Sequence, residues 1–172
     1  MEIPVFSFAA YSGTGKTTFL EKLIPCLKDM GLRPAAVKHD GHDFRMDRPG
    51  TDTFRLAEAG AEAVAIVSGG GFALLERRSR TVEEIAGMLK DVDLILAEGF
   101  KHGPYPRIVL YRAGSGLPLA AEPERCLAVA SDVPIQAPCP VFPLDDPKPL
   151  AEFLAEAVRG NQKEETSCAD YD

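Results

Sequence analysis

The sequence contains few cysteines, and their spacing is not typical of a disulfide framework or a zinc site. Cys26, Cys126, Cys139 and Cys168 are scattered along 172 residues, and no two of them form a C-x-x-C pair. Structural zinc sites usually bring cysteines in such close pairs, and disulfides belong to oxidising compartments. We therefore expect reduced thiols in a protein of the cytoplasm.

The sequence also lacks a secretory signal, a membrane-spanning run and an excess of positive charge. Residues 1–4 show no basic region followed by a long apolar stretch. No run reaches the roughly 18 consecutive apolar residues of a membrane helix. The net charge is −7, which disfavours general attraction to nucleic acid or to anionic membranes. We expect neither as a partner, so any bound polyanion must be held by a local site.

Apolar runs alternate with helical patterns along the chain, and 45% of its residues are hydrophobic. Strands are predicted at 3–9, 33–38, 63–68, 72–76, 93–99, 107–111 and 126–130, and helices at 16–30, 51–59, 81–89 and 146–158. Pro25 predicts a kink or a break in the first helix. Thr81 and Glu84 have the spacing of a capping box. The segment 134–147 holds five prolines and is expected to be mostly loop.

This order predicts an α/β fold of the three-layer P-loop NTPase type. We expect a mostly parallel sheet with helices on both faces and a peripheral antiparallel strand pair, because three glycines separate the runs 63–68 and 72–76. Residues 1–159 are predicted to form one P-loop nucleotide-binding domain. Residues 160–172 are polar and almost unpatterned, which indicates a disordered acidic tail.

The segment 10–18, AYSGTGKTT, lies between the first strand and the first helix and has the spacing of a P-loop, G-x-x-x-x-G-K-[ST], with Ala10 in place of the first glycine. Glycines allow the backbone amides to turn toward one anion, and the helix start adds its positive dipole end. Lys16 is expected to bind the outer phosphates, Thr17 to ligate Mg²⁺ and Thr18 to donate to the inner phosphate. A glycine-rich turn with a solvated lysine is the alternative. The predicted nucleotide-binding residues of this loop are Ser12, Gly13, Thr14, Gly15, Lys16, Thr17 and Thr18.

Glu98 ends the apolar run 93–98, which we expect beside the P-loop strand. An acidic residue there is typical of a Walker-B element that holds Mg²⁺, and Glu98 is therefore predicted as a metal ligand and catalytic residue. The alternative is a carboxylate that caps nearby amides. Asp93 begins the same strand at the opposite edge of the sheet, so a structural role is expected for it.

Ionisable residues are concentrated in the segment 38–43, KHDGHD, which follows the second strand. A loop that contacts phosphates, Mg²⁺ or a second substrate is expected, with Lys38 binding the nucleotide and Asp40 orienting a water molecule. The alternatives are a transition-metal site and simple solvated charge.

Two residues near later strands are further candidates. Asp132 follows the apolar run 126–130, at the end of that strand, and could accept hydrogen bonds from guanine, although the N-K-x-D guanine motif is missing. Lys101 follows Glu98 in the segment EGFK and could add a cation near the nucleotide or a partner, or could be a plain surface lysine.

With these motifs in place, the sequence resembles the molybdopterin-guanine dinucleotide biosynthesis adapter proteins, the MobB family. The resemblance covers roughly residues 5–110. Its matching stretches are the P-loop with the helix after it, VKHDGHDF at 37–44, DRPGTDTFR at 47–55, AGA at 59–61 and LAEGFK at 96–101. The two blocks KHDGHDF and EGFK are more particular than the P-loop. The sequence departs from the family at Ala10 and after Arg112.

The resemblance implies a cytoplasmic, homodimeric adapter that binds GTP and Mg²⁺ and is at most a weak GTPase. It also implies association with the guanylyltransferase that attaches GMP to molybdopterin, and hence an indirect link to molybdopterin. Dimer contacts are expected at 72–75 and 107–111. A small-molecule P-loop kinase and a non-hydrolysing interaction module are the alternatives, although no arginine-rich lid is visible. Partner or substrate contacts are expected from His39, His42, Asp43, Asp47, Asp52, Arg55 and Lys101.

Overall fold

The computed structural model describes residues 3–41, 44–100 and 103–169, with side chains described as far as residue 160. The chain forms two compact units. The first consists of residues 1–39 and 86–172, and the second of residues 40–85. Residues 10–18 belong to the first unit, whereas Asp40 is the first residue of the second.

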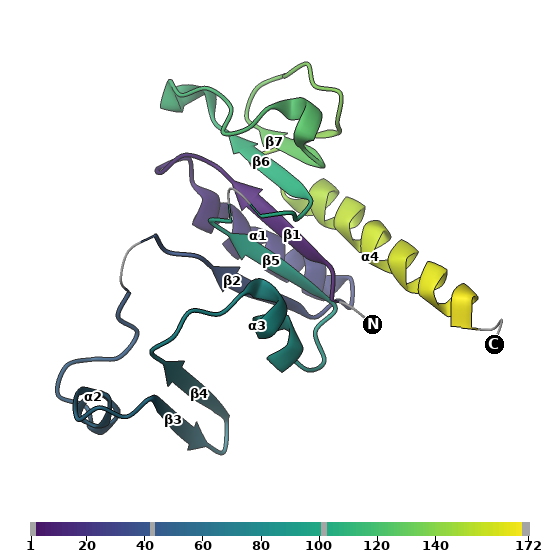
Figure 1. Ribbon diagram of the computed structural model, residues 1–172. Helices are drawn as coiled ribbons and strands as arrows, with labels where there is room; N and C mark the ends of the chain where they lie inside the picture. The colour runs from purple at the N-terminus through teal and green to yellow at the C-terminus, as the bar shows by residue number, and fades with distance from the viewer. Residues whose placement is uncertain (1–2, 42–43, 101–102, 170–172) are drawn as a thin grey trace. The chain divides into compact units, whose positions relative to one another are not determined.

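The first unit is built on one six-stranded parallel sheet (Figure 1). The strand order is β2-β5-β1-β6-β7-β8. Its strands are β1 (Val5–Ala9), β2 (Pro34–Lys38), β5 (Leu94–Glu98), β6 (Arg107–Tyr111), β7 (Ala128–Ser131) and β8 (Val141–Pro143), and its long helices are α1 (Lys16–Asp29) and α4 (Lys148–Ala169). Two single 3₁₀ turns, Ala113–Ser115 and Pro123–Arg125, lie between β6 and β7. The predicted α/β class with a mostly parallel sheet is confirmed.

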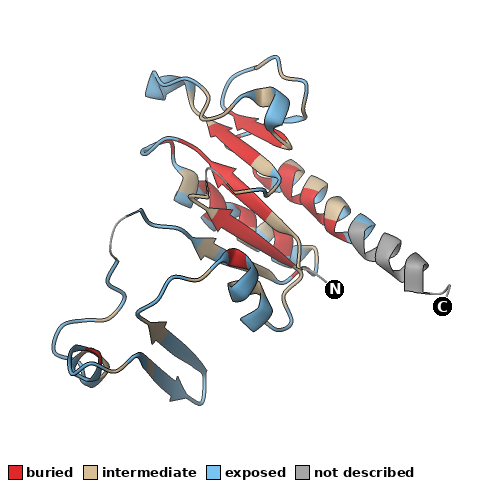
Figure 2. Ribbon diagram, in the orientation of Figure 1, coloured by how far each residue is buried: buried red, intermediate tan, exposed pale blue. Residues whose placement is uncertain are grey.

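The core of this unit lies in the central strands, which are buried on both faces (Figure 2). On one face, α1 and α4 pack over the sheet through a single apolar cluster that includes Leu23, Leu27 and Leu154. On the other face, Ala9, Val109 and Val129 are covered by the connections that follow β6 and β7. Burial on both faces explains why β1 and β5 have nearly continuous apolar sequences rather than alternating ones.

α1 runs through Pro25 as one helix, so of the kink or break expected from the sequence the break does not occur, and the kink stays a prediction. Leu23 and Leu27 are fully buried on either side of the proline, and this packing offsets the one hydrogen bond that proline cannot donate. The helix ends at Asp29, and Gly31, two residues later, has a φ of +82°. There the amide of Gly31 donates to the carbonyl of Lys28 and that of Leu32 to Leu27, as in a Schellman motif.

Two features at the end of the chain differ from the sequence pattern. β8 lies inside the proline-rich segment that was expected to be loop, and it pairs with β7 in parallel. It is a three-residue edge strand with Pro143 as its last residue, a position that proline tolerates, and it is too short to give a periodic signal. The backbone of α4 continues to Ala169; the disordered tail expected after residue 159 stays a prediction.

The second unit contains α2 (Asp52–Glu58) and an antiparallel hairpin of β3 (Ala63–Ser68) and β4 (Gly71–Glu76). The hairpin confirms the predicted strand pair. α3 (Val82–Met88) follows it and leads back into the first unit. Its predicted capping box is confirmed, since the amide of Thr81 donates to Glu84 Oε2 at 2.8 Å and the amide of Glu84 donates to Thr81 Oγ1 at 3.2 Å. In the described part of the chain, no helix is long and apolar enough to cross a membrane.

Candidate functional site

The loop between β1 and α1 has the backbone geometry that an anion cradle needs. Gly13 and Gly15 have φ values of +80° and +91°, which favour glycine. Gly15 is the N-cap of α1 and provides no side-chain cap, and the first helical turn contains no acidic residue. The first amides of α1 and its positive dipole end therefore have no local carboxylate to satisfy them. Ala10 is buried in the apolar core.

The side chains of this loop divide into buried and accessible ones. Thr14 is only 4% exposed, whereas Ser12, Thr17 and Thr18 are exposed. Lys16 is partly buried at the start of α1. The hydroxyls of Thr17 and Thr18 are therefore accessible to a ligand bound at the helix start, as their predicted roles require.

Lys16 and Glu98 meet at the carboxyl edge of the sheet. The distance between Lys16 Nζ and Glu98 Oε1 is 3.7 Å, and the two side chains are 16% and 15% exposed. They come together because β5 pairs in parallel with β1, which places Glu98 directly opposite Phe8 at the base of the loop. An ion pair this shielded from water is stronger than one at the surface.

The end of β2 lies on the other side of β5. Lys38 is the register partner of Glu98, and the amide of His39 donates to the carbonyl of Glu98 at 2.8 Å. The ring of His39 packs edge-on against Phe100, with 5.3 Å between the ring centroids. Gly99, with a φ of +92°, packs so closely that an added Cβ would lie 2.5 Å from the carbonyl oxygen of His39. Lys38, His39 and Glu98 thus share one edge of the sheet.

Asp132 lies at the carboxyl end of β7, on the opposite side of β1. Its Oδ1 atom accepts a hydrogen bond from the amide of Ala113 at 2.8 Å, and its Oδ2 atom lies 3.7 Å from Arg112 Nη1. Arg112 Nε in turn donates to the carbonyl oxygen of Thr14 at 3.4 Å. No role was expected for Arg112 from the sequence. The only signal was its position directly after the apolar run 107–111, and this becomes informative once β6 is known to pair with β1.

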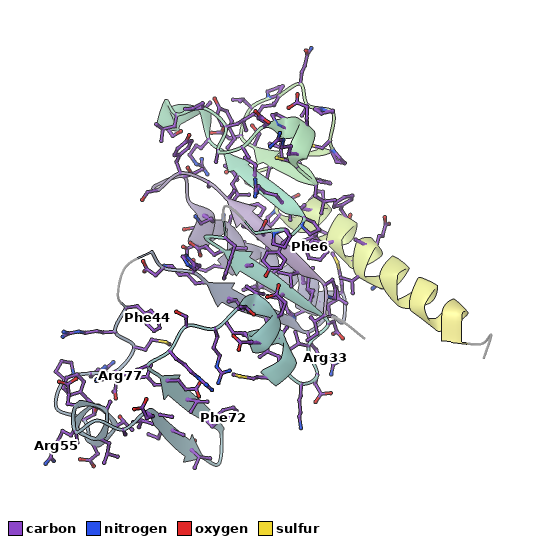
Figure 3. All side chains as sticks on the ribbon, in the orientation of Figure 1. Phe6, Arg33, Phe44, Arg55, Phe72 and Arg77 are labelled. Carbon is purple, nitrogen blue, oxygen red and sulfur yellow. The ribbon has the colours of Figure 1, made fainter. Side chains whose placement is uncertain are left out.

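The other predicted contact residues lie in the second unit or outside the described residues. Asp40 is exposed at the start of the second unit. Asp52 and Arg55 are exposed on α2 and form an ion pair at 3.8 Å; Figure 3 labels Arg55 on this helix. His42, Asp43 and Lys101 lie outside the described residues. The contributions of all these residues to a site stay predictions.

The carboxylate of Asp47 is already engaged within the second unit. It accepts hydrogen bonds from the Thr51 hydroxyl at 2.9 Å and from the Arg48 amide at 2.7 Å. Hydrogen bonds from Thr53 and Thr51 to the charged form hold the pKa of Asp47 below its ordinary value. Thr51 also caps α2 by accepting from the amide of Phe54. Asp47 therefore supports the start of α2, whatever else it contacts.

At the opposite edge of the sheet, Asp93 has the structural role expected of it. Arg33 donates to its carboxylate from the backbone amide at 2.7 Å, from Nε at 3.1 Å and from Nη2 at 2.9 Å. These contacts join the start of β2 to the start of β5. Hydrogen bonding from Arg33 lowers the pKa of Asp93 below its ordinary value.

The described residues contain no cluster of three or more His, Cys, Asp or Glu side chains placed to hold a metal ion. Cys26, Cys126 and Cys139 are free thiols. Burial is the main cause that raises the pKa of the Cys126 thiol. Thr17 and Glu98 are the candidates for holding a metal ion at the loop.

The chain matches one protein family over most of its length. The family model for molybdopterin guanine dinucleotide synthesis protein B, MobB, matches residues 5–132. The molybdopterin-guanine dinucleotide biosynthesis adapter protein of Escherichia coli K12 is 40% identical over 166 residues, covering 90% of this chain and 93% of that protein. The adapter protein of the same name from Haemophilus influenzae is 34% identical over 157 residues, covering 89% of this chain and 88% of that protein.

The fold is also that of solved MobB structures. The crystal structure of Bacillus subtilis MobB has a TM-score of 0.69 and 27% identity, with 91% of this chain and 98% of that chain covered. The MobB homologue from Bacillus stearothermophilus has a TM-score of 0.63 and 28% identity, with the same coverage. The match extends past residue 112, where the sequence resemblance alone was weak. This chain belongs to the molybdopterin guanine dinucleotide synthesis protein B family.

Proposed function

We propose that this protein is an adapter in molybdopterin guanine dinucleotide biosynthesis that binds GTP with Mg²⁺ at the loop between β1 and α1. The observation that carries the proposal is the pair of Lys16 and Glu98, with 3.7 Å between Nζ and Oε1, at the mouth of a loop whose helix start has no acidic residue. Family membership supports the biosynthetic role, because its relatives in Escherichia coli and Haemophilus influenzae are adapter proteins of this pathway.

The residues at the loop fit a triphosphate with its divalent ion. The amides at the start of α1 and the cation of Lys16 supply donors for phosphate oxygens. The exposed hydroxyl of Thr17 and the carboxylate of Glu98 supply the hard oxygen ligands that Mg²⁺ prefers. Bound Mg²⁺ would neutralise phosphate charge. Lys38 and Asp132, at the ends of strands on either side, are the further candidates for nucleotide contacts.

The ion pair between Lys16 and Glu98 gives this site a way to keep its charges balanced without a ligand. A lone lysine beside a helix start would lie in an unfavourable positive potential. The carboxylate of Glu98 offsets that potential in the free protein. On binding, Lys16 exchanges this carboxylate for phosphate oxygens, and Glu98 exchanges the ammonium group for the metal ion. Each charged group has a partner in both states, so neither state contains an isolated, partly buried charge.

Hydrolysis by this site should be slow. The loop amides, Lys16 and Glu98 provide positioning and charge neutralisation, which are the main sources of catalysis in phosphoryl transfer. The remaining requirement is a residue that orients the attacking water. We assign this to the segment after β2, in which Asp40 and His39 follow directly on Lys38. A weak GTPase is consistent with an adapter that uses GTP as a bound ligand.

The hairpin of the second unit supports assembly into a homodimer. Val67 and Phe72 are register partners and are 81% and 78% exposed, and Ile66 and Leu74 are 59% and 45% exposed. Figure 3 labels Phe72 on this hairpin. A two-stranded hairpin with apolar side chains on both faces is unstable alone in water, so it needs a partner. We propose that a second copy of the chain covers it, as expected for residues 72–75.

The partner of the adapter is proposed to be the guanylyltransferase that joins GMP to molybdopterin, in the cytoplasm, so that molybdopterin is contacted only indirectly. The exposed residues Asp52 and Arg55 of α2 are candidates for that contact, together with His42, Asp43 and Lys101 outside the described residues. Co-purification with the guanylyltransferase, with and without GTP and Mg²⁺, tests this part. Recovery that is the same in all conditions and no greater than with an unrelated bait would refute it.

Isothermal titration with GTP, with and without Mg²⁺, tests the nucleotide site. Lys16→Ala should abolish binding, and Glu98→Gln should remove most of its dependence on Mg²⁺. Lys28→Ala is the matched control, because it removes one positive charge from the exposed far end of the same helix. If Lys16→Ala binds GTP as tightly as the control does, the site is wrongly assigned.

A further inference from the structure

Arg112 extends from the end of β6 toward three separate segments of the first unit. β6 pairs with β1 on the side away from β5, so the carboxyl end of β6 lies beside the loop that leaves β1. Arg112 Nε donates to the carbonyl oxygen of Thr14 at 3.4 Å. Thr14 is in the middle of the loop and is only 4% exposed. This hydrogen bond therefore ties the loop to a strand more than 90 residues later in the sequence.

The other two nitrogens of the guanidinium group face carboxylates. Nη1 lies 3.7 Å from Asp132 Oδ2, and Nη2 lies 3.6 Å from Asp145 Oδ1. The second oxygen of Asp132 accepts from the amide of Ala113 at 2.8 Å. The hydroxyl of Ser115 donates to the carbonyl of Arg112 at 2.7 Å. A planar guanidinium presents a separate nitrogen to each of these three partners in a fixed direction, whereas all three donors of a lysine ammonium lie on one nitrogen.

We propose that Arg112 is a positioning residue that sets the orientation of the phosphate loop. The loop peptides are trans, so a carbonyl and the following N–H point in opposite directions. When the carbonyl of Thr14 is held toward Arg112, the N–H of Gly15 is turned away from Arg112, and on this proposal that N–H is left free to donate to a bound phosphate. Gly15 has a φ of +91° and no side chain, so little else restricts the rotation of this peptide.

The same contacts give Asp132 a second role. Both of its oxygens are engaged, one by Ala113 and the other by Arg112, and its side chain is 19% exposed. Asp132 therefore acts on the loop through Arg112, in addition to any contact with a nucleotide base. The end of β7 and the loop after β1 are linked by this one side chain. The assignment rests on the proposed function, because a positioning role has meaning only if the loop binds phosphate.

The first experiment measures the loop in the nucleotide-free protein. Amide order parameters from ¹⁵N relaxation are compared for wild type, Arg112→Gln and the control Arg125→Gln, whose arginine is 80% exposed and forms a local ion pair with Glu122. Rigid backbone gives values near 0.85 and flexible backbone gives values below about 0.6. We expect Arg112→Gln to lower the values at Thr14 and Gly15 toward the flexible range, while β1 and the control keep rigid values.

The second experiment measures binding of Mg²⁺ with inorganic tripolyphosphate and, separately, with GTP. Loss of a hydrogen bond from a charged donor corresponds to roughly tenfold in affinity. Arg112→Gln should weaken both ligands by about this factor, because the effect arises at the phosphates. Arg112→Lys keeps the positive charge but not the planar set of guanidinium donors, and should recover only part of the affinity that Arg112→Gln loses. Arg125→Gln should bind both ligands like wild type.

The outcomes separate the two proposals. If wild type binds the ligands, but Arg112→Gln binds them within twofold of wild type and keeps rigid loop amides, the role of Arg112 is refuted and the site itself stands. If wild type binds neither ligand, the nucleotide site is refuted. In that case the positioning role is refuted with it, and the order parameters report only whether Arg112 keeps the loop rigid. Because the side chain of Arg112 is 41% exposed, both substitutions should fold, and Arg112→Lys serves as the second variant if Arg112→Gln does not.

Discussion

Replacing Gly99 with alanine would place a methyl group 2.5 Å from the carbonyl oxygen of His39. The contact is with backbone, which cannot move aside as the end of a flexible side chain can. His39 is also held by the hydrogen bond from its amide to the carbonyl of Glu98 at 2.8 Å. The substitution therefore forces the end of β2 away from the end of β5, at the edge where Lys38, His39 and Glu98 lie.

Two costs add in this variant. Alanine at a φ of +92° carries backbone strain of about 1–2 kcal/mol. Relief of the clash requires a displacement of about 0.9 Å to reach an ordinary contact at 3.4 Å, and such forced shifts in packed regions cost about 1–3 kcal/mol. We expect Gly99→Ala to lower the free energy of unfolding by about 3 kcal/mol, a large share of the 5–15 kcal/mol typical of a domain.

Gly31→Ala is the matched control. Gly31 has a similar φ of +82°, but no atom lies within 4 Å of the position that its Cβ would occupy. The Gly31→Ala variant should therefore lose only the backbone strain, about 1 kcal/mol of the free energy of unfolding. Urea denaturation followed by circular dichroism gives both values, and the difference of about 2 kcal/mol reports the clash. Equal losses for the two variants, within about 0.5 kcal/mol, would show that the close approach of Gly99 to His39 is not a constraint on the folded protein.

Three further predictions concern stability and assembly. Leu23→Ala should lower the free energy of unfolding by about 3 kcal/mol in urea, because Leu23 is fully buried between α1 and the sheet. Arg33 lowers the pKa of Asp93 in the folded protein. The ionised carboxylate therefore stabilises the folded state above the unfolded pKa of about 3.9, and this stabilisation is lost as the pH falls through the lower folded pKa. Melting temperatures should therefore fall more steeply with acid in wild type than in Asp93→Asn, and parallel curves would contradict this. Phe72→Ser should shift sedimentation toward the monomer, whereas a substitution at exposed Met88 on α3 should not.

Much of the fold follows from local sequence patterns because those patterns have local physical causes. The apolar runs at 5–9 and 94–97 form strands buried on both faces, and a run that is apolar at nearly every position has no solvent-facing side. Thr81 and Glu84 form their capping box because both hydrogen bonds lie within one turn. Gly69 and Gly70 form the two-residue turn of the hairpin, in which Ser68 pairs with Gly71. This feature is also local, because the turn and the residues that it joins are neighbours in the sequence.

The structure differs from the sequence expectation where packing or pairing with distant residues decides the local conformation. Pro25 lies inside a continuous helix because buried leucines on either side hold the helix against the sheet. β8 forms because β7 presents an edge with which it pairs. The three residues of β8 are too few for their sequence to predict a strand. Propensity is a weak guide at such positions, since tertiary contacts outweigh it.

The sequence by itself determined the residue types of the loop between β1 and α1 and their order between a strand and a helix, because the turn at Gly13 and Gly15 needs residues that tolerate a positive φ. It also placed Glu98 and Lys38 at strand ends. Only the tertiary structure decided that Lys16 and Glu98 meet, that Gly99 fits against His39, and that Arg112 reaches Thr14. Each of these contacts depends on the strand order β2-β5-β1-β6, which is set by how the whole sheet packs against α1 and α4 rather than by any one segment.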